Sequence, residues 1–108
     1  MIKHVAFDDY GFKAFGSVTS SHTTLLTLTD DADVLMVFNT LDQPVLLEVP
    51  SKSEKSTAST TKEIRLPANA SFSIDCRTNQ KRIPKGTIRI KYASGAPTSG
   101  EITITALR

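Results

Sequence analysis

The C-terminal segment of the chain, residues 86–107, contains two runs in which apolar and polar residues strictly alternate. One face of each run collects the apolar side chains, which are Ile88, Ile90 and Tyr92 in the first run and Ile102, Ile104 and Ala106 in the second. Successive side chains of a β-strand point to opposite faces, so each run predicts a strand with one buried and one solvated face. The turn-rich residues 93–100 between them predict a terminal β-hairpin. This pattern is typical of an antiparallel β-protein.

The rest of the chain extends this pattern into a single β-domain. The 108 residues are 39% hydrophobic, which is enough for one modest core. Further strand candidates fall at residues 23–29, 33–40, 44–50, 62–66 and 71–76, at spacings near the roughly 8 to 12 residues found in sandwiches and barrels. The sequence therefore predicts an all-β fold, an antiparallel β-sandwich of about seven to eight strands.

Residues 1–22 differ from the strands that follow. Phe7, Tyr10, Phe12 and Phe15 are mixed with aspartates, glycines and Lys13, and they follow neither a strand period nor a helix period. We expect an irregular N-terminal arm over residues 1–22, which docks on its own domain or on a neighbour, and a sandwich domain over residues 23–108.

The role of the four aromatic residues has two interpretations. They anchor a partner protein, because aromatic side chains dominate interface energetics, or they close the core of the sandwich itself. Met36 and Phe38, in the apolar run 34–38, are assigned to the core.

Residues 51–61 contain no aliphatic side chain larger than alanine and predict a solvated loop. Cys76 is the single cysteine, so an internal disulfide and a multi-cysteine zinc site are excluded. It shares a strand face with Phe72 and Ile74, which indicates a buried, inert thiol.

The sequence offers no catalytic or cofactor-binding constellation. Asp30, Asp31 and Asp33 lack the spacing of a calcium loop and are typical of a turn. His4 and His22 have no ligand residues at metal-binding spacing, and no serine lies in a nucleophile-elbow motif. We expect a protein that is not an enzyme and has no catalytic residues, no cofactor and no metal.

The charge pattern favours no class of partner. The formal net charge is +2, from 13 Lys and Arg against 11 Asp and Glu. A basic set gathers near the last strands and comprises Lys81, Arg82, Lys85, Arg89 and Lys91. It lacks the interleaved aromatic residues of single-strand binding folds, so we interpret it as a solvated sheet face, compatible with an acidic protein partner. Without a signal peptide or an apolar span, the protein is expected to stay in the compartment where it is made.

Three segments carry a resemblance to a known class of proteins: residues 64–75 (IRLPANASFSID), 85–92 (KGTIRIKY) and 94–102 (SGAPTSGEI). Over about residues 34–108 the chain resembles the small β-sandwich accessory virion proteins of tailed bacteriophages, known as decoration, cement or staple proteins. The resemblance implies a jelly-roll-like sandwich that binds the major capsid protein on the outside of the capsid, as a homodimer or homotrimer. It also implies synthesis in the host cytoplasm, no active site, and neither nucleic acid nor membrane as a partner.

Under this hypothesis the aromatic residues of the arm, Phe7, Tyr10, Phe12 and Phe15, contact the capsid, and the basic set is the second part of the predicted interface. The alternative is a binding module of a phage tail or fibre that recognises a host glycan or receptor through residues 51–61 and 93–100. Those loops lack the exposed aromatic faces that sugars prefer. A third interpretation is a small regulatory or nucleic-acid-binding protein that uses residues 81–91.

Overall fold

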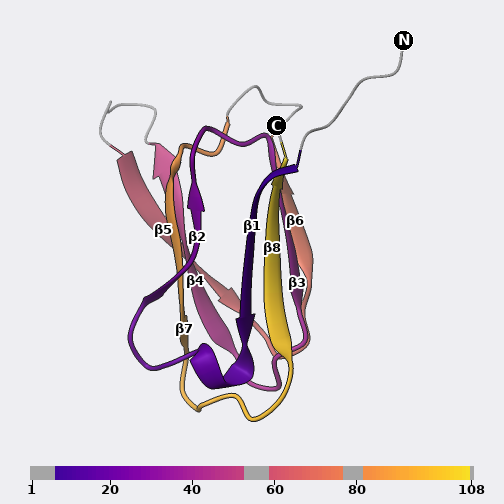
Figure 1. Cartoon of the computed structure of the whole chain (residues 1–108). Helices are drawn as coiled ribbons and strands as arrows, with labels where there is room; N and C mark the ends of the chain where they lie inside the picture. Colours follow the sequence, from indigo (N-terminus) through magenta and orange to yellow (C-terminus); the bar gives the residue numbers. More distant parts are fainter. Residues whose placement is uncertain (1–6, 53–58, 77–81, 108) are drawn as a thin grey trace.

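The computed structural model describes residues 7–52, 59–76 and 82–107. These residues form eight β-strands and one short 3-10 helix, shown in Figure 1. In chain order the elements are β1 (Phe7–Ala14), η1 (Phe15–Ser17), β2 (Thr23–Leu28), β3 (Val34–Asn39), β4 (Val45–Lys52), β5 (Ser59–Leu66), β6 (Phe72–Asp75), β7 (Gly86–Tyr92) and β8 (Glu101–Leu107).

The strands form two four-stranded antiparallel sheets packed face to face. The first sheet has the order β1-β8-β3-β6 and the second has the order β2-β7-β4-β5. Apart from the β4–β5 hairpin, each strand is followed by a strand of the opposite sheet (Figure 1). This order is that of a jelly roll, which is built from two interlocked Greek keys. The predicted fold class is confirmed.

The core lies between the inward faces of the sheets, and the alternating C-terminal strands supply its centre. Ile88 and Ile90 of β7 and Ile102 and Ile104 of β8 are completely buried. Residues on β3 and β4 continue the same layer, and Leu35, Val37, Val45 and Leu47 are at most 1% exposed. Burying each such side chain stabilises the fold by about 1.5–3 kcal/mol relative to leaving it in water.

The predicted terminal hairpin is wrong. β7 pairs with β2 and β4, whereas β8 pairs with β1 and β3 in the other sheet. The connecting residues 93–100 cross the end of the sandwich and are held by the β3–β4 turn. Asp42 Oδ1 accepts a hydrogen bond from Thr98 N at 2.8 Å, and Ala93 N donates to Pro44 O at 3.0 Å. Each of the two strands lies between two other partners at the centre of its own sheet. They therefore do not pair with each other, although they are neighbours in sequence.

The expected irregular arm is also wrong for residues 7–14, which form the regular strand β1. This strand pairs with β8 from Phe7↔Leu107 to Ala14↔Glu101, with a bulge between Phe7 and Asp9. The alternation is inverted: Tyr10 and Phe12 point outward, whereas Asp9, Gly11 and Lys13 take the inward positions. The apolar residues of this strand therefore do not mark its buried face. The irregular part is limited to the connection of residues 15–22. Residues 1–6 lie outside the described residues.

The polar segment 51–61 and Cys76 were also assigned from the sequence, one to a loop and the other to the core. The solvated loop predicted over residues 51–61 is shorter, because β4 continues to Lys52 and β5 begins at Ser59; residues 53–58 lie outside the described residues. Cys76 packs at the margin of the core with Phe72 and Ile74, as its pattern indicates, and it is partly buried. Burial raises the pKa of its thiol, which opposes formation of the reactive thiolate.

Gly11 allows β1 to lie close to β2, where the two sheets meet along one side. A Cβ at this position would clash with the carbonyl oxygen of Leu25 and lie 3.0 Å from both Leu26 Cβ and Ile104 Cγ2. Because two of these neighbours are fixed by backbone geometry, the strands would have to separate.

We therefore expect Gly11→Ala to lower the free energy of unfolding by about 1–3 kcal/mol, the usual cost of overpacking. Gly16→Ala is the matched control, because no atom lies within 4 Å of a Cβ added there, and we expect a change below about 0.5 kcal/mol. Urea unfolding followed by circular dichroism measures both variants. Equal stability of the two variants would contradict the close approach of β1 to β2.

The turn around Asp42 predicts a pH dependence. Hydrogen bonds from the Thr98 hydroxyl and Thr98 N lower the pKa of the Asp42 carboxyl below its ordinary value. A carboxyl whose folded-state pKa is depressed contributes stability above its unfolded pKa and loses that contribution as the pH falls through the folded value.

Thr98→Val removes the hydroxyl donor, so we expect this variant to unfold at lower urea concentration than the parent at pH 7. The gap should narrow below about pH 4, as Asp42 becomes protonated. Urea midpoints measured from pH 7 to pH 2 test this expectation, and a gap independent of pH would contradict it.

Candidate protein-docking face

The outward side of the first sheet carries an unusual set of large apolar residues. The strand register determines which side chains lie next to one another in a row across this sheet. One row contains Tyr10, Thr105 and Met36, because Tyr10 pairs with Thr105 and Thr105 pairs with Met36. The adjacent row joins Phe12, Thr103 and Phe38. We name the surface formed by Tyr10, Phe12, Met36, Phe38, Thr103 and Thr105 the aromatic face.

The aromatic rings of this face are open to solvent. Tyr10 is 63% exposed, Phe12 49% and Phe38 53%. Single exposed apolar residues are common on proteins, but contiguous ones mark interaction surfaces. The threonines of β8 separate the rings of β1 from those of β3, so the face has apolar flanks with hydroxyl groups between them.

The structure places the predicted aromatic anchors as follows. Tyr10 and Phe12 belong to the aromatic face, and the backbone of Phe7 pairs with Leu107. Phe15 is 41% exposed on η1, where its N–H donates to Gly100 O at 3.0 Å. Tyr10, Phe12 and Phe15 therefore do not close the core of their own sandwich, which removes that interpretation for these three.

The assignment of Phe38 to the core is wrong, and Met36 beside it also projects outward. Leu35 and Val37 take the inward positions of β3, which leaves Met36 and Phe38 on the solvent side. The run 34–38 is apolar at every position, so no polar residue shows which face is buried. The alternation of threonines along β8 is the signal that could have identified the outward row.

The outward side of the second sheet is charged, and we name it the charged face. Its central row contains Glu63, Glu48 and Arg89, on β5, β4 and β7. Arg89 Nη2 lies 2.6 Å from Glu48 Oε1, and Arg89 Nε donates to the same oxygen at 2.8 Å. Arg65 and Lys91 lie on the neighbouring row, opposite Leu46.

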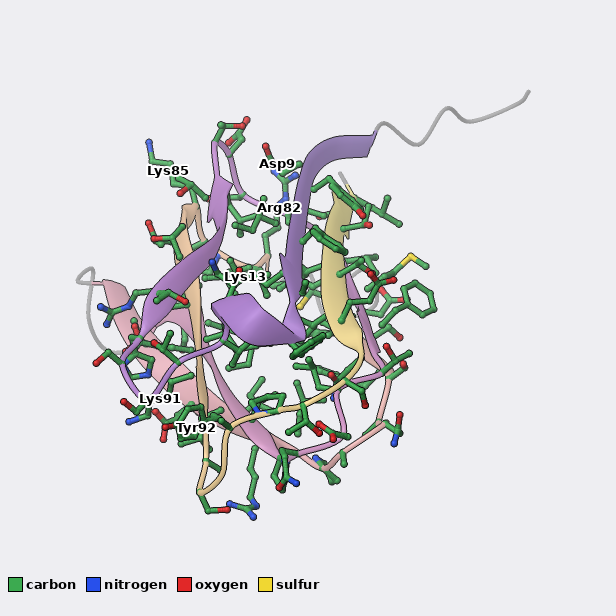
Figure 2. The ribbon with its side chains drawn as sticks, turned by 60° about the horizontal axis from the view of Figure 1, so that its bottom comes forward. Asp9, Lys13, Arg82, Lys85, Lys91 and Tyr92 are labelled. Atoms are coloured by element: carbon green, nitrogen blue, oxygen red, sulfur yellow. The ribbon has the colours of Figure 1, made fainter. Side chains whose placement is uncertain are left out.

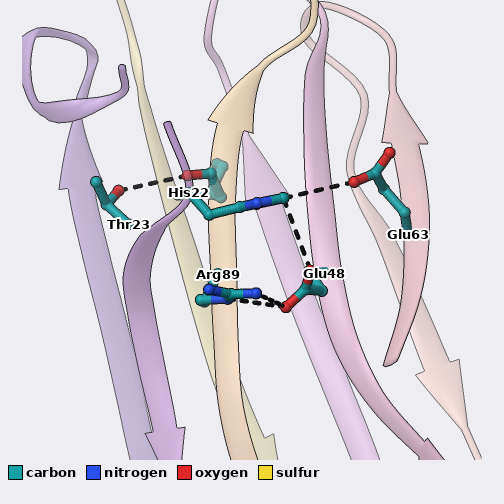
Figure 3. Close-up of polar contacts among 6 residues, drawn as sticks. His22, Thr23, Glu48, Glu63 and Arg89 are labelled. Atoms are coloured by element: carbon teal, nitrogen blue, oxygen red, sulfur yellow. Dashed lines mark hydrogen bonds and ion pairs between the residues drawn. The ribbon is translucent and has the colours of Figure 1, made fainter. Parts of the chain in front are cut away.

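His22 extends across β7 toward the two glutamates of this row (Figure 3). Its Nε2 atom lies 3.4 Å from Glu63 Oε2 and 3.8 Å from Glu48 Oε2, and it makes no hydrogen bond. Glu48 and Glu63 are direct cross-strand neighbours, an arrangement in which like charges repel. Arg89, and His22 when protonated, offset this repulsion.

Three members of the predicted basic set lie on or next to β7 of the second sheet, away from the aromatic face: Lys85, Arg89 and Lys91. Lys85 and Lys91 are on the side of the second sheet, far from β8, in Figure 2. Arg89 and Lys91 share the outward side of β7, as their alternation predicts. Arg82 Nε lies 2.9 Å from Asp33 Oδ1, and Lys81 lies outside the described residues. The predicted interface therefore divides between two surfaces.

The acidic cluster forms a turn. Asp31 N donates to Asp30 Oδ1 at 2.8 Å, and Asp31 Oδ1 accepts from Lys85 N at 2.9 Å. Within the described part of the chain, no group of three or more His, Cys, Asp or Glu side chains is arranged to hold a metal ion. No helix among the described residues has the length and apolar character required to cross a membrane.

Comparison with known protein families, curated proteins and solved structures finds no match to this chain. What this face can bind is therefore inferred from the residues of this chain.

Residues that point outward from the sheet should tolerate replacement by polar residues. We expect Phe12→Thr and Phe38→Thr each to change the free energy of unfolding by less than about 1 kcal/mol, because both rings are half-exposed and threonine suits a strand. Ile104→Ala is the inward control, with an expected loss of about 2–5 kcal/mol. Chemical unfolding of the three variants gives the comparison. A loss at Phe38 as large as that at Ile104 would place Phe38 in the core.

Proposed function

We propose that this chain is a non-enzymatic structural virion protein that binds the outer surface of a bacteriophage capsid and stabilises the shell. The observation that carries the proposal is the aromatic face. On this sheet surface the rings of Tyr10, Phe12 and Phe38 are each about half exposed to solvent or more. Aromatic residues supply much of the binding energy at protein interfaces, so this face is suited to dock on another protein.

The fold supports the same proposal by analogy. The strand order is that of a jelly roll, an architecture that occurs in viral capsid domains and in lectins. Many functions share one fold, so this analogy has less weight than the surface chemistry. The segments that resemble phage accessory proteins fall on β5 to β6, on β7 and on the connection to β8.

The proposed mechanism is stabilisation by binding. A protein that binds the closed shell but not its dissociated subunits lowers the free energy of the closed state, by an amount set by its concentration relative to its Kd. A homodimer or homotrimer would present two or three aromatic faces, and simultaneous engagement raises avidity without a new contact.

A second candidate is a phage tail or fibre module that recognises a host glycan or receptor. Exposed rings also pack against sugar rings, and Tyr10 adds a hydroxyl group that can hydrogen-bond to a sugar. The aromatic face thus supplies the exposed aromatic rings that residues 51–61 and 93–100 lack.

Co-sedimentation with phage capsids that lack their accessory protein, followed by heating, tests the proposal. We expect saturable binding and survival of the loaded particles at a temperature that opens bare ones. Phe12→Thr combined with Phe38→Thr should weaken binding by about tenfold or more, the loss expected from removing interface anchors.

Lys91→Ala, on the charged face, is the matched control and should retain binding. If Lys91→Ala weakened binding while the aromatic variant did not, the charged face would be the docking surface. If the protein bound no capsid but bound oligosaccharides on a glycan array, the second candidate would replace the first.

A further inference from the structure

The second sheet has one long free edge, which is formed by β5. This strand pairs with β4 on one side, and no strand among the described residues lies on its other side (Figure 1). It has eight residues, whereas β6, an edge strand of the first sheet, has four. The side of the sandwich where β1 approaches β2 is closed. A long free edge presents unpaired N–H and C=O groups to which another strand can be added.

The hydrogen bonds of β4 show which groups of β5 point toward this edge. Ala93 N donates to Pro44 O at 3.0 Å, and hydrogen-bonded pairs alternate along an antiparallel ladder. The even-numbered residues of β4 therefore bond to β7, and its odd-numbered residues bond to β5. Odd-numbered residues of β4 lie opposite even-numbered residues of β5. The N–H and C=O groups of Glu63 and Arg65 therefore point toward the free edge.

The side chains of Glu63 and Arg65 share the outward side of this edge and have opposite charges. Arg65 is exposed, and within the described part of the chain it forms no ion pair. Glu63 is 46% exposed, and its Oε2 atom lies 3.4 Å from His22 Nε2 without a hydrogen bond. Arg89 instead pairs with the neighbouring Glu48. An acid and a base two residues apart are thus both open to a partner strand.

We propose that β5 of a second copy of this chain adds to this edge, antiparallel and about a two-fold axis through Ile64. The second sheets of the two copies then form one continuous sheet. Glu63 of each copy lies opposite Arg65 of the other copy, and both residues direct their backbone groups toward each other. Ile64 meets its own counterpart at the axis.

Charge selects this register over its neighbours. A two-fold axis perpendicular to the sheet keeps the same side outward in both copies, so only side chains of the same face meet. Pairing centred on Lys62 or on Glu63 places like charges opposite each other, which destabilises a sheet. Among the pairings centred on residues 61–65, only the one at Ile64 places opposite charges directly across from each other.

The same symmetry determines where the aromatic faces lie. Packed sheets are nearly parallel, so an axis perpendicular to the second sheet leaves the outward sides of both first sheets facing the same direction. Both aromatic faces are then presented to one surface, as simultaneous engagement of a capsid requires. This consequence rests on the proposed function, whereas the pairing of β5 does not.

Sedimentation equilibrium of the full chain tests the pairing. A strand pair with about four backbone hydrogen bonds is a small interface, so we expect a monomer–dimer equilibrium with a Kd on the order of 100 µM. Amide shifts in NMR spectra that depend on protein concentration locate the contact, and we expect them along β5.

Charge reversal identifies the register. Glu63→Arg and Arg65→Glu each place like charges opposite each other, so each variant alone should dimerise about tenfold more weakly or worse. A mixture of the two variants restores both pairs of opposite charge and should form a heterodimer about as tightly as the parent dimer. Lys91→Glu, the same type of change on the interior strand β7, is the matched control and should leave the Kd unchanged. The NMR spectra of the variants report whether the fold is retained.

Any of three outcomes would overturn the inference. The first is a parent protein that stays monomeric up to about 1 mM, tenfold above the expected Kd. The second is a set of concentration-dependent shifts confined to strands of the first sheet, and the third is a mixture of the two variants that dimerises no better than either alone. The assay contains no capsid, so its failure is distinguishable from failure of the chain to bind capsids.

Discussion

The packing of β7 and β8 in opposing sheets is the constraint on which the rest of the molecule depends. Each strand lies at the centre of its sheet, between two antiparallel neighbours, and contributes two completely buried isoleucines to the shared core. Successive side chains of a strand point to opposite faces of the sheet. These inward positions, together with the strand register, therefore determine which residues face solvent on the neighbouring strands. A shift of one residue in β8 would bury Thr103 and Thr105 and expose Ile102 and Ile104, so the core pattern specifies the register strongly.

The same constraint produces two outer surfaces of different chemistry. Fixing the isoleucines of β8 inward places its threonines outward, between the aromatic residues of β1 and β3. Because Ile88 and Ile90 point inward, Arg89 and Lys91 lie on the opposite side of the molecule, with Arg89 beside Glu48 and Lys91 beside Leu46. The aromatic residues and the basic residues therefore cannot contact one flat partner surface together. We propose the aromatic face as the docking surface, because its rings are exposed.

The sequence predicted most of the strands and the sandwich, because alternating or apolar runs bounded by turn residues are local signals. It could not predict that β7 and β8 separate, since the choice of sheet depends on strands far away in the chain. β1 was missed because its inward positions hold Asp9, Gly11 and Lys13, which face β2 at a tight edge. Phe38 was assigned to the core because the apolar run around it hides the alternation. Tyr10 and Phe12 were identified as candidate anchors by residue type alone, whereas their union with Met36 and Phe38 required the register.

We propose that the aromatic face becomes covered when the protein binds its partner. Hydroxyl-radical footprinting tests it most directly, because methionine and aromatic side chains are oxidised in proportion to their exposure. The protein would be labelled free and bound to capsid particles, and modification would be quantified by mass spectrometry. We expect binding to protect Tyr10, Phe12, Met36 and Phe38, while Tyr92 on the other sheet keeps its reactivity. Unchanged oxidation of those four residues in the bound state would contradict this proposal.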